Sequence, residues 1–96
     1  MKYTVVFTQG ALKSLKKLDK PTAALVVGWI RKKLDGCENP RQFGKALTAN
    51  HSGEWRYRIG DYRVLAKIED NIVTIHVLTV GHRRDIYQKM KTEKRI

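Results

Sequence analysis

Residues 54–80 read EWRYRIGDYRVLAKIEDNIVTIHVLTV, and this stretch decides the fold. It is rich in β-branched and aromatic residues, which favour strands, and it is interrupted only at Gly60-Asp61 and at Asp70-Asn71. Both dipeptides suit two-residue hairpin turns, because Gly, Asn and Asp tolerate the positive φ that these turns require. The stretch therefore predicts three antiparallel strands joined by two tight turns.

The two turns also predict the register of the strands. They place these residues opposite one another: Ile59 and Tyr62, Tyr57 and Val64, Trp55 and Ala66, Ile68 and Val73, Ala66 and Ile75, Val64 and Val77. Side chains in a strand alternate between faces, so all of these residues share one face, which we predict to be the core face. The opposite face receives Arg56, Arg58, Arg63, Leu65, Lys67, Thr74, His76 and Leu78.

Three arginines converge on this second face. Arg58 is expected directly opposite Arg63, and Arg56 lies two residues before Arg58. Like charges in a cross-strand pair destabilise a sheet, so the cluster indicates an anion that the arginines bind together. Guanidinium groups bind phosphate oxygens in pairs and stay charged at any relevant pH, which favours a phosphate site. The alternative is a solvated face on which the arginines lie over Leu65 and Leu78 and serve solubility.

The residues before this stretch predict a strand and two helices. Residues 2–7 suit a short strand, and Thr8 and Asp19 suit helix N-caps. Apolar residues then recur three and four apart, as on the buried face of a helix: Ala11, Leu12, Leu15 and Leu18 in the first, and Ala23, Val26, Val27, Ile30 and Leu34 in the second. Gly36 is a natural stop for the second helix.

Residues 37–53 lack this periodicity and predict a long connection with a helical turn at 43–47. Gly81 is expected to end the sheet, His82–Met90 to form a short helix, and Lys91–Ile96 to fray. The predicted fold class is α+β with the order β-α-α-β-β-β-α. It has a small, mostly antiparallel sheet, two N-terminal helices packed on one face and a short C-terminal helix. The length predicts a single domain, residues 1–96.

The chain is strongly basic. Its 96 residues include 20 Lys and Arg against 9 Asp and Glu, which gives a net charge of +11. That excess attracts polyanions, whether nucleic acid, an anionic membrane surface or an acidic protein. The single cysteine excludes an internal disulfide and cysteine-based zinc sites, and no apolar run is long enough for a signal peptide or a membrane span. These features predict a cytoplasmic protein without a metal or cofactor.

The final predicted helix adds a second pair of polar groups. Arg83 and Tyr87 are four residues apart and project from one side, while Ile86 and Met90 form the apolar stripe that packs the helix down. Because the helix directly follows the last strand, its first turn is expected beside the arginine face. The alternative for Tyr87 is a half-buried ring at the helix margin.

Two motifs carry a resemblance to a known family. They are GEWRYRIGDYRV at Gly53–Val64 and VGHRRDIY at Val80–Tyr87. Together with the order of the elements, they resemble the RelE/ParE superfamily of bacterial toxins, and within it the RelE branch. The likeness covers nearly the whole chain, and the Gly-Asp-Tyr-Arg turn and the Gly-His-Arg-Arg-Asp-Ile-Tyr ending are among its most specific parts.

The resemblance implies a ribosome-dependent endoribonuclease that cleaves messenger RNA in the decoding site without a metal. A ribose 2′-hydroxyl attacks the adjacent phosphate, which requires a base, charge stabilisation on the phosphate and an acid for the leaving 5′-oxygen. By position, Arg63 matches the family's transition-state arginine, Arg83 its second catalytic arginine and Tyr87 its catalytic tyrosine. Four further residues are expected to contact RNA: Arg56, Arg58, Lys67 and His82.

The general base stays open. The best-known member of the family has lysines where this chain has Arg56 and Arg58, and an arginine does not readily release its proton. Tyr87, close to several guanidinium groups, is one candidate, and His82 is another because imidazole groups titrate near neutral pH. His51 and His76 are weaker options.

The resemblance also implies partners: a cognate antitoxin, small, acidic and RelB-like, and the ribosome with its message, without a small-molecule cofactor. The antitoxin is expected to wrap the two N-terminal helices, where Leu25 and Trp29 are candidate contacts. Two other functions stay open. One is a ParE-like inhibitor of DNA gyrase, which generally lacks the set Arg63, Arg83 and Tyr87, and the other is a non-catalytic module that binds RNA or a partner protein.

Overall fold

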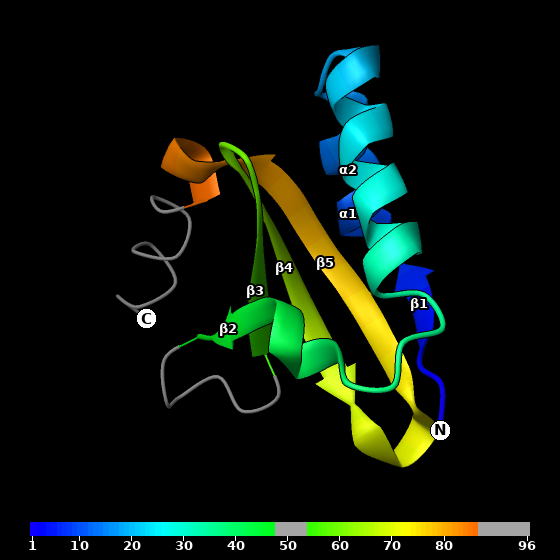
Figure 1. Ribbon diagram of the computed structural model, residues 1–96. Coiled ribbons are helices and arrows are strands. Elements are labelled where there is room, and N and C mark those ends of the chain that lie inside the picture. Colours follow the sequence, from blue (N-terminus) through cyan, green and yellow to red (C-terminus); the bar gives the residue numbers. More distant parts are fainter. Residues whose placement is uncertain (48–53, 87–96) are drawn as a thin grey trace.

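The computed structural model describes residues 1–47 and 54–86, and its sheet has the strand order β1-β5-β4-β3-β2 (Figure 1). In chain order the elements are β1 (Thr4–Phe7), α1 (Gln9–Lys16), α2 (Lys20–Lys33), the 3₁₀ turn η1 (Pro40–Phe43), β2 (Gly44–Ala46), β3 (Glu54–Ile59), β4 (Tyr62–Glu69), the 3₁₀ turn η2 (Asp70–Ile72) and β5 (Thr74–His82). β1 runs parallel to β5, and the other neighbouring strands are antiparallel. The predicted α+β class is confirmed.

The helices α1 and α2 lie together on one face of the sheet (Figure 1). Both begin at the predicted caps. The Thr8 hydroxyl accepts a hydrogen bond from the Ala11 amide at 3.2 Å, and the Asp19 carboxylate accepts one from the Thr22 amide at 3.3 Å. These bonds satisfy amides that a first helical turn leaves without a partner.

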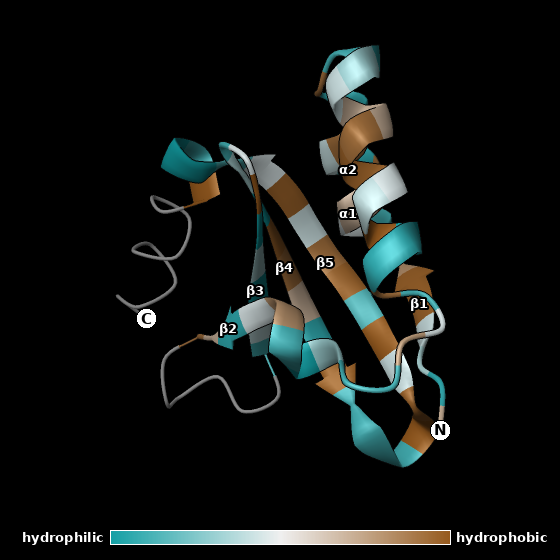
Figure 2. Ribbon diagram, viewed as in Figure 1, coloured by the Kyte–Doolittle hydropathy of each residue, from teal (hydrophilic) through white to brown (hydrophobic). Residues whose placement is uncertain are grey.

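The core fills the space between the helices and the inner face of the sheet, where brown residues gather in Figure 2. Its buried members are Ala11, Val26, Ile30, Leu34, Tyr57, Ile59, Val64, Ala66, Ile75, Val77 and Val80. The core face predicted for β3 and β4 is therefore confirmed. Trp29 is partly buried and packs its ring against Tyr57 and Phe43 at this core, whereas Leu25 is 63% exposed.

The β3–β4 hairpin has the predicted register. Its cross-strand pairs include Trp55 with Ala66, Tyr57 with Val64 and Ile59 with Tyr62. Arg58 lies directly opposite Arg63, as predicted. Gly60 adopts a φ of +59°, as the first residue of a type II′ hairpin loop does.

The β4–β5 connection is longer than predicted. Residues 70–72 form the 3₁₀ turn η2, closed by a hydrogen bond from the Val73 amide to the Asp70 carbonyl at 3.1 Å. Val73 then adopts a left-handed φ of +50°, which is rare for a β-branched residue. The predicted two-residue turn is therefore wrong, and Ile68 pairs with Ile75 instead of Val73.

A β-bulge shifts the pairing again further along β5. Ala66 pairs with Val77 and Leu65 with Thr79, so Leu78 is the extra residue between them. The altered pairs beyond the bulge are Val64 with Val80, instead of Val77, and Arg63 with Gly81. Leu65 is only 5% exposed, so its predicted place on the solvent face is wrong, and Thr79 opposite it is 9% exposed.

The segment before β3 contains a strand that no sequence pattern marks. The helical turn expected at 43–47 is wrong, because η1 ends at Phe43 and β2 then pairs antiparallel with β3. Gly44 allows this pairing because it has no Cβ. An added Cβ would clash with the carbonyl oxygen of Arg56 and would lie 2.8 Å from Cδ1 of Tyr57 and 2.9 Å from Cδ1 of Trp55.

We expect Gly44→Ala to lower the free energy of unfolding by about 1–3 kcal/mol, because the new methyl group overlaps atoms of β3. Gly28→Ala is the matched control, since a Cβ at Gly28 of α2 meets nothing within 4 Å. That control should gain about 1 kcal/mol from the better helix propensity of alanine. Urea unfolding measures both values, and equal stabilities would contradict the close contact between β2 and β3.

β5 ends one residue later than predicted, at His82, and helical residues begin at Arg83. Ile86 is 4% exposed, so its predicted packing is confirmed. His51, Tyr87, Met90 and residues 91–96 lie outside the described residues. Within the ranges 1–47 and 54–86, no helix is long and apolar enough to cross a membrane.

Candidate functional site

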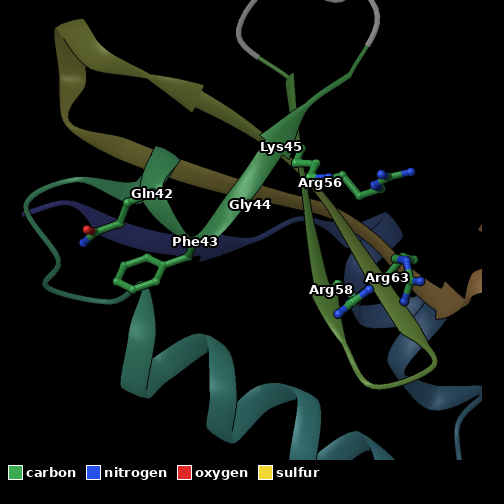
Figure 3. Close-up of a pocket in the computed structure, with 7 residues that line it drawn as sticks. All are labelled: Gln42, Phe43, Gly44, Lys45, Arg56, Arg58 and Arg63. Carbon is green, nitrogen blue, oxygen red and sulfur yellow. The ribbon is translucent and has the colours of Figure 1, made fainter.

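The edge of the sheet around β2 and β3 carries a groove of about 500 Å³, which we call the basic groove (Figure 3). It is lined by Gln42, Phe43, Gly44, Lys45, Arg56, Arg58 and Arg63. The three arginines come from β3 and β4, and the lysine comes from β2. The predicted convergence of the arginines on one face is confirmed by the register.

The side chains that line the basic groove are suited to an anion. Among the described lining residues, four are cationic and none is a carboxylate. Within residues 1–47 and 54–86, no group of three or more His, Cys, Asp or Glu side chains is placed to hold a metal ion. Cations held this close repel one another, so an anion bound between them lowers the energy of the whole cluster.

The side chain of Arg63 is held beside the β3–β4 turn by two hydrogen bonds. Nη1 donates hydrogen bonds to the carbonyl oxygens of Gly60 and Tyr62, both at 3.0 Å. A guanidinium group has five N–H donors, so others remain for a ligand. Arg63 is thus positioned before any ligand arrives.

Arg83 is fastened to the same turn, although it follows β5. Its backbone amide donates to the Asp61 carbonyl oxygen at 2.7 Å. Burial lowers the pKa of Arg63, and nearby positive charges lower it further, namely those of Arg58, Arg56 and Arg83, against the raising effect of Asp61. Arg83 therefore contributes its charge to the Arg63 environment from a different element of the fold.

His82 has a structural contact that occupies one ring nitrogen. Its Nδ1 accepts a hydrogen bond from the Arg84 amide at 3.2 Å, as an N-cap does. The ring packs edge-on against Tyr62, with 5.6 Å between ring centroids. His82 thus supports the start of the helical residues and is not among those that line the basic groove.

Lys67 and His76 lie farther along the sheet. Lys67 is exposed on β4, opposite Glu54 of β3 and His76 of β5. Nε2 of His76 lies 3.0 Å from Oε1 of Glu69, which forms an ion pair when the histidine is protonated. The structure does not bring Lys67 or His76 into the basic groove.

Lys45 is a groove residue that sequence reasoning missed. It is exposed on β2 and lies directly opposite Arg56. A three-residue strand inside a long connection leaves no periodic pattern to recognise. The only signal is Gly44 before it, because an isolated glycine often marks a close approach of two backbones.

The segment that carries β2 is anchored by a clamp of three side chains: Tyr3, Arg41 and Asp70. The Arg41 guanidinium donates to both carboxylate oxygens of Asp70, at 3.0 and 2.9 Å, and the Tyr3 hydroxyl donates to Asp70 at 2.5 Å. The buried Tyr57 hydroxyl donates to the Pro40 carbonyl oxygen at 2.8 Å, and burial raises the pKa of Tyr57. These bonds tie η1 to β3 and to the β4–β5 turn, and they tie that turn to Tyr3 just before β1.

Asp70→Asn is expected to weaken the fold at neutral pH and to flatten its response to acid. Hydrogen bonds from Arg41 and Tyr3 lower the pKa of Asp70 in the folded chain. A carboxylate of this kind stabilises the fold above its unfolded pKa, about 3.9, and loses that effect as pH falls through its lower folded pKa. Below about pH 4 the wild type should therefore lose Tm more steeply than the variant. Parallel Tm curves from circular dichroism would contradict the clamp.

Known proteins are similar to this chain in sequence. A family model described as the ParE toxin of type II toxin-antitoxin systems, parDE, matches residues 5–87. Toxin RelG of Mycobacterium tuberculosis is 38% identical over 89 residues, which cover 93% of this chain and 100% of that protein. Toxin RelE of the same organism is 30% identical over 86 residues, covering 90% of this chain and 87% of that protein.

Solved structures give the same result. A chain of the toxin-antitoxin complex RelBE2 from Mycobacterium tuberculosis matches with a TM-score of 0.77 and 35% identity, over 85% of this chain and 92% of that chain. A mutant of the E. coli toxin RelE in the free state matches with a TM-score of 0.74 over 100% of this chain and 99% of that chain. Its identity of 23% supports the fold alone. The chain therefore belongs to the RelE/ParE superfamily of toxins of type II toxin-antitoxin systems, and within it to the RelE-like branch.

Proposed function

We propose that this toxin is an endoribonuclease that cleaves messenger RNA in the decoding site of the ribosome and thereby stops translation. The reaction is the metal-free attack of a ribose 2′-hydroxyl on the adjacent phosphate. The observation that carries the proposal is the convergence of arginines around one turn. Arg58 lies opposite Arg63, and Arg83 is fastened to Asp61 of the same turn.

Charge stabilisation is the part of the reaction that this geometry supports most directly. The phosphate gains negative charge as the 2′-oxygen attacks, and preorganised donors stabilise that charge more than they stabilise the ground state. The charges of Arg58, Arg56 and Arg83 lower the pKa of Arg63, which means that these cations repel one another without an anion. In the proposal, Arg63 and Arg83 contact the reacting phosphate, and Arg56 and Arg58 hold the strand.

Proton transfer is assigned to Tyr87 in preference to His82. Because Nδ1 of His82 accepts a hydrogen bond from Arg84, the neutral imidazole carries its proton on Nε2 and has no free acceptor for a 2′-hydroxyl. His82 would have to break this bond to act as a base. Tyr87 follows Arg83 by four residues in the sequence, and its phenol is the proposed base.

The experiment that tests the proposal uses purified protein and ribosomes programmed with a defined message. Mapping of the 5′ ends should reveal cuts within the codon in the decoding site. A parallel supercoiling assay with DNA gyrase tests the ParE-like alternative. An intact message would overturn the nuclease proposal, and gyrase inhibition together with an intact message would replace it with that alternative.

We also propose a small acidic antitoxin as the partner of this chain. The similar RelBE2 structure from Mycobacterium tuberculosis is a toxin-antitoxin complex. On this chain, α1 and α2 expose Leu12 and Leu25, at 46% and 63%, among many lysines. An acidic segment with apolar side chains fits such a surface by charge and by hydrophobic contact. Co-purification with the product of a neighbouring gene tests this pairing.

A further inference from the structure

The basic groove contains two cross-strand pairs of like charge, one between β3 and β4 and one between β2 and β3. Arg58 of β3 lies opposite Arg63 of β4, and Arg56 of β3 lies opposite Lys45 of β2. Each pair is unfavourable by itself, because equal charges face one another directly. The second pair is unexplained by the reaction centre at Arg63, since Lys45 comes from the other side of β3.

The two pairs are spaced to take two phosphates. Arg56 and Arg58 are two residues apart on one face of β3, which corresponds to about 7 Å along the strand. That distance is close to the repeat of one nucleotide in an extended single strand. A single strand that lies along β3 thus places one phosphate near Arg58 and Arg63 and the adjacent phosphate near Arg56 and Lys45.

We propose that Lys45 and Arg56 form a second phosphate subsite, which holds the phosphate adjacent to the scissile one. This inference rests on the proposed function, because it takes the ligand to be single-stranded RNA. Its new element is Lys45, the one groove-lining cation on β2 among the described residues. The subsite binds the strand by charge and places the reacting phosphate, so Lys45 is a binding residue and not a catalytic one.

The surroundings of β2 support a site built to present this lysine. β2 has only three residues, and the neighbours of Lys45 are the small residues Gly44 and Ala46. The strand is held by its pairing with β3, and the clamp of Tyr3, Arg41 and Asp70 holds η1 before it. Lys45 is therefore carried by a segment that is fixed at two places, although its own side chain is exposed.

The test measures RNA binding with the full chain and a short single-stranded RNA that carries a 2′-deoxy nucleotide at the cleavage position. A neutral methylphosphonate replaces the adjacent phosphate, on each side in turn. On one side it should weaken wild-type binding about fivefold. Lys45→Gln should bind the normal RNA about fivefold more weakly than the wild type, and the neutral linkage should weaken its binding no further. The slope of log affinity against log salt concentration should fall by about 0.7.

Lys32→Gln is the matched control. It removes the same charge from the exposed surface of α2, outside the groove lining, and should keep the full sensitivity to the neutral linkage. The subsite is overturned if Lys45→Gln also keeps that sensitivity, or if the neutral linkage leaves wild-type binding unchanged on both sides. Cleavage of ribosome-bound message by the wild type is scored separately. If the wild type cleaves the message but Lys45→Gln binds the two RNAs as the wild type does, only the subsite is refuted. If Lys45→Gln shows the expected loss but the wild type does not cleave, only the nuclease is refuted.

Discussion

Arg63→Ala is expected to reduce cleavage of ribosome-bound message by about 10²- to 10³-fold and to abolish growth inhibition. That range is typical for the loss of one preorganised donor to a developing negative charge. Arg63 is held by bonds to the carbonyl oxygens of Gly60 and Tyr62, so its remaining donors can bind a phosphate with little reorganisation. Single-turnover cleavage on programmed ribosomes, followed by mapping of the 5′ ends, measures the effect.

The stability of the same variant separates a catalytic role from a structural one. Removal of Arg63 relieves its repulsion with Arg58, Arg56 and Arg83. The two hydrogen bonds that it loses are to backbone carbonyl groups at the turn, one of them exposed and the other partly buried. The Tm of Arg63→Ala should therefore equal or exceed that of the wild type. Arg63→Lys keeps the charge and loses the planar guanidinium, so its cleavage activity should fall between those of the wild type and Arg63→Ala. Full activity in a folded Arg63→Ala chain would remove Arg63 from the mechanism.

The β3–β4 hairpin was predictable because its determinants are local. Gly60 accepts the positive φ of the loop, and the alternation on either side of it fixes both faces. The pair Arg58 and Arg63 follows from these two facts alone. For the same reason, the sequence identifies most of the core face and three of the four cations that line the groove.

The errors lie where distant residues decide the local structure. Asp70 reads as a hairpin residue, yet its carboxylate is bonded to Tyr3 and Arg41, which come from the other end of the chain and from η1. These contacts accompany a three-residue turn, and the register of β5 changes with it. The bulge near Leu78 also lies where α1 approaches, since the Thr8 hydroxyl donates to the Val77 carbonyl oxygen at 2.7 Å and lies 3.3 Å from that of Leu78. No local pattern encodes either contact.

The basic groove could also be predicted only in part, because one of its cations comes from a strand that the sequence does not reveal. Lys45 joins Arg56 because β2 pairs with β3, and that pairing depends on the missing Cβ of Gly44. The sequence shows a glycine followed by a lysine, but it does not show which strand they meet. A site assembled from three strands is therefore recognised from sequence only in the part that one hairpin supplies.

Arg83→Ala and Arg84→Ala form a pair of adjacent variants with sharply different expected results. Both remove one exposed arginine from the start of the helical residues, so net charge and helix propensity change equally. The charge of Arg83 lowers the pKa of Arg63, whereas Arg84 is not among the groups that shift it. Arg83→Ala should therefore reduce cleavage about 10²-fold or more, and Arg84→Ala should stay within about threefold of the wild type.

The backbone contacts of the two residues make this comparison informative. The Arg83 amide donates to the Asp61 carbonyl, and the Arg84 amide donates to Nδ1 of His82. Alanine keeps both amides, so each variant should preserve the docking of the helical residues on the β3–β4 turn. Equal loss of activity in both variants, with unchanged Tm, would mean that diffuse positive charge is sufficient. A loss confined to Arg83→Ala requires a guanidinium at one place beside Arg63, which a reaction at a single phosphate demands and general affinity for RNA does not.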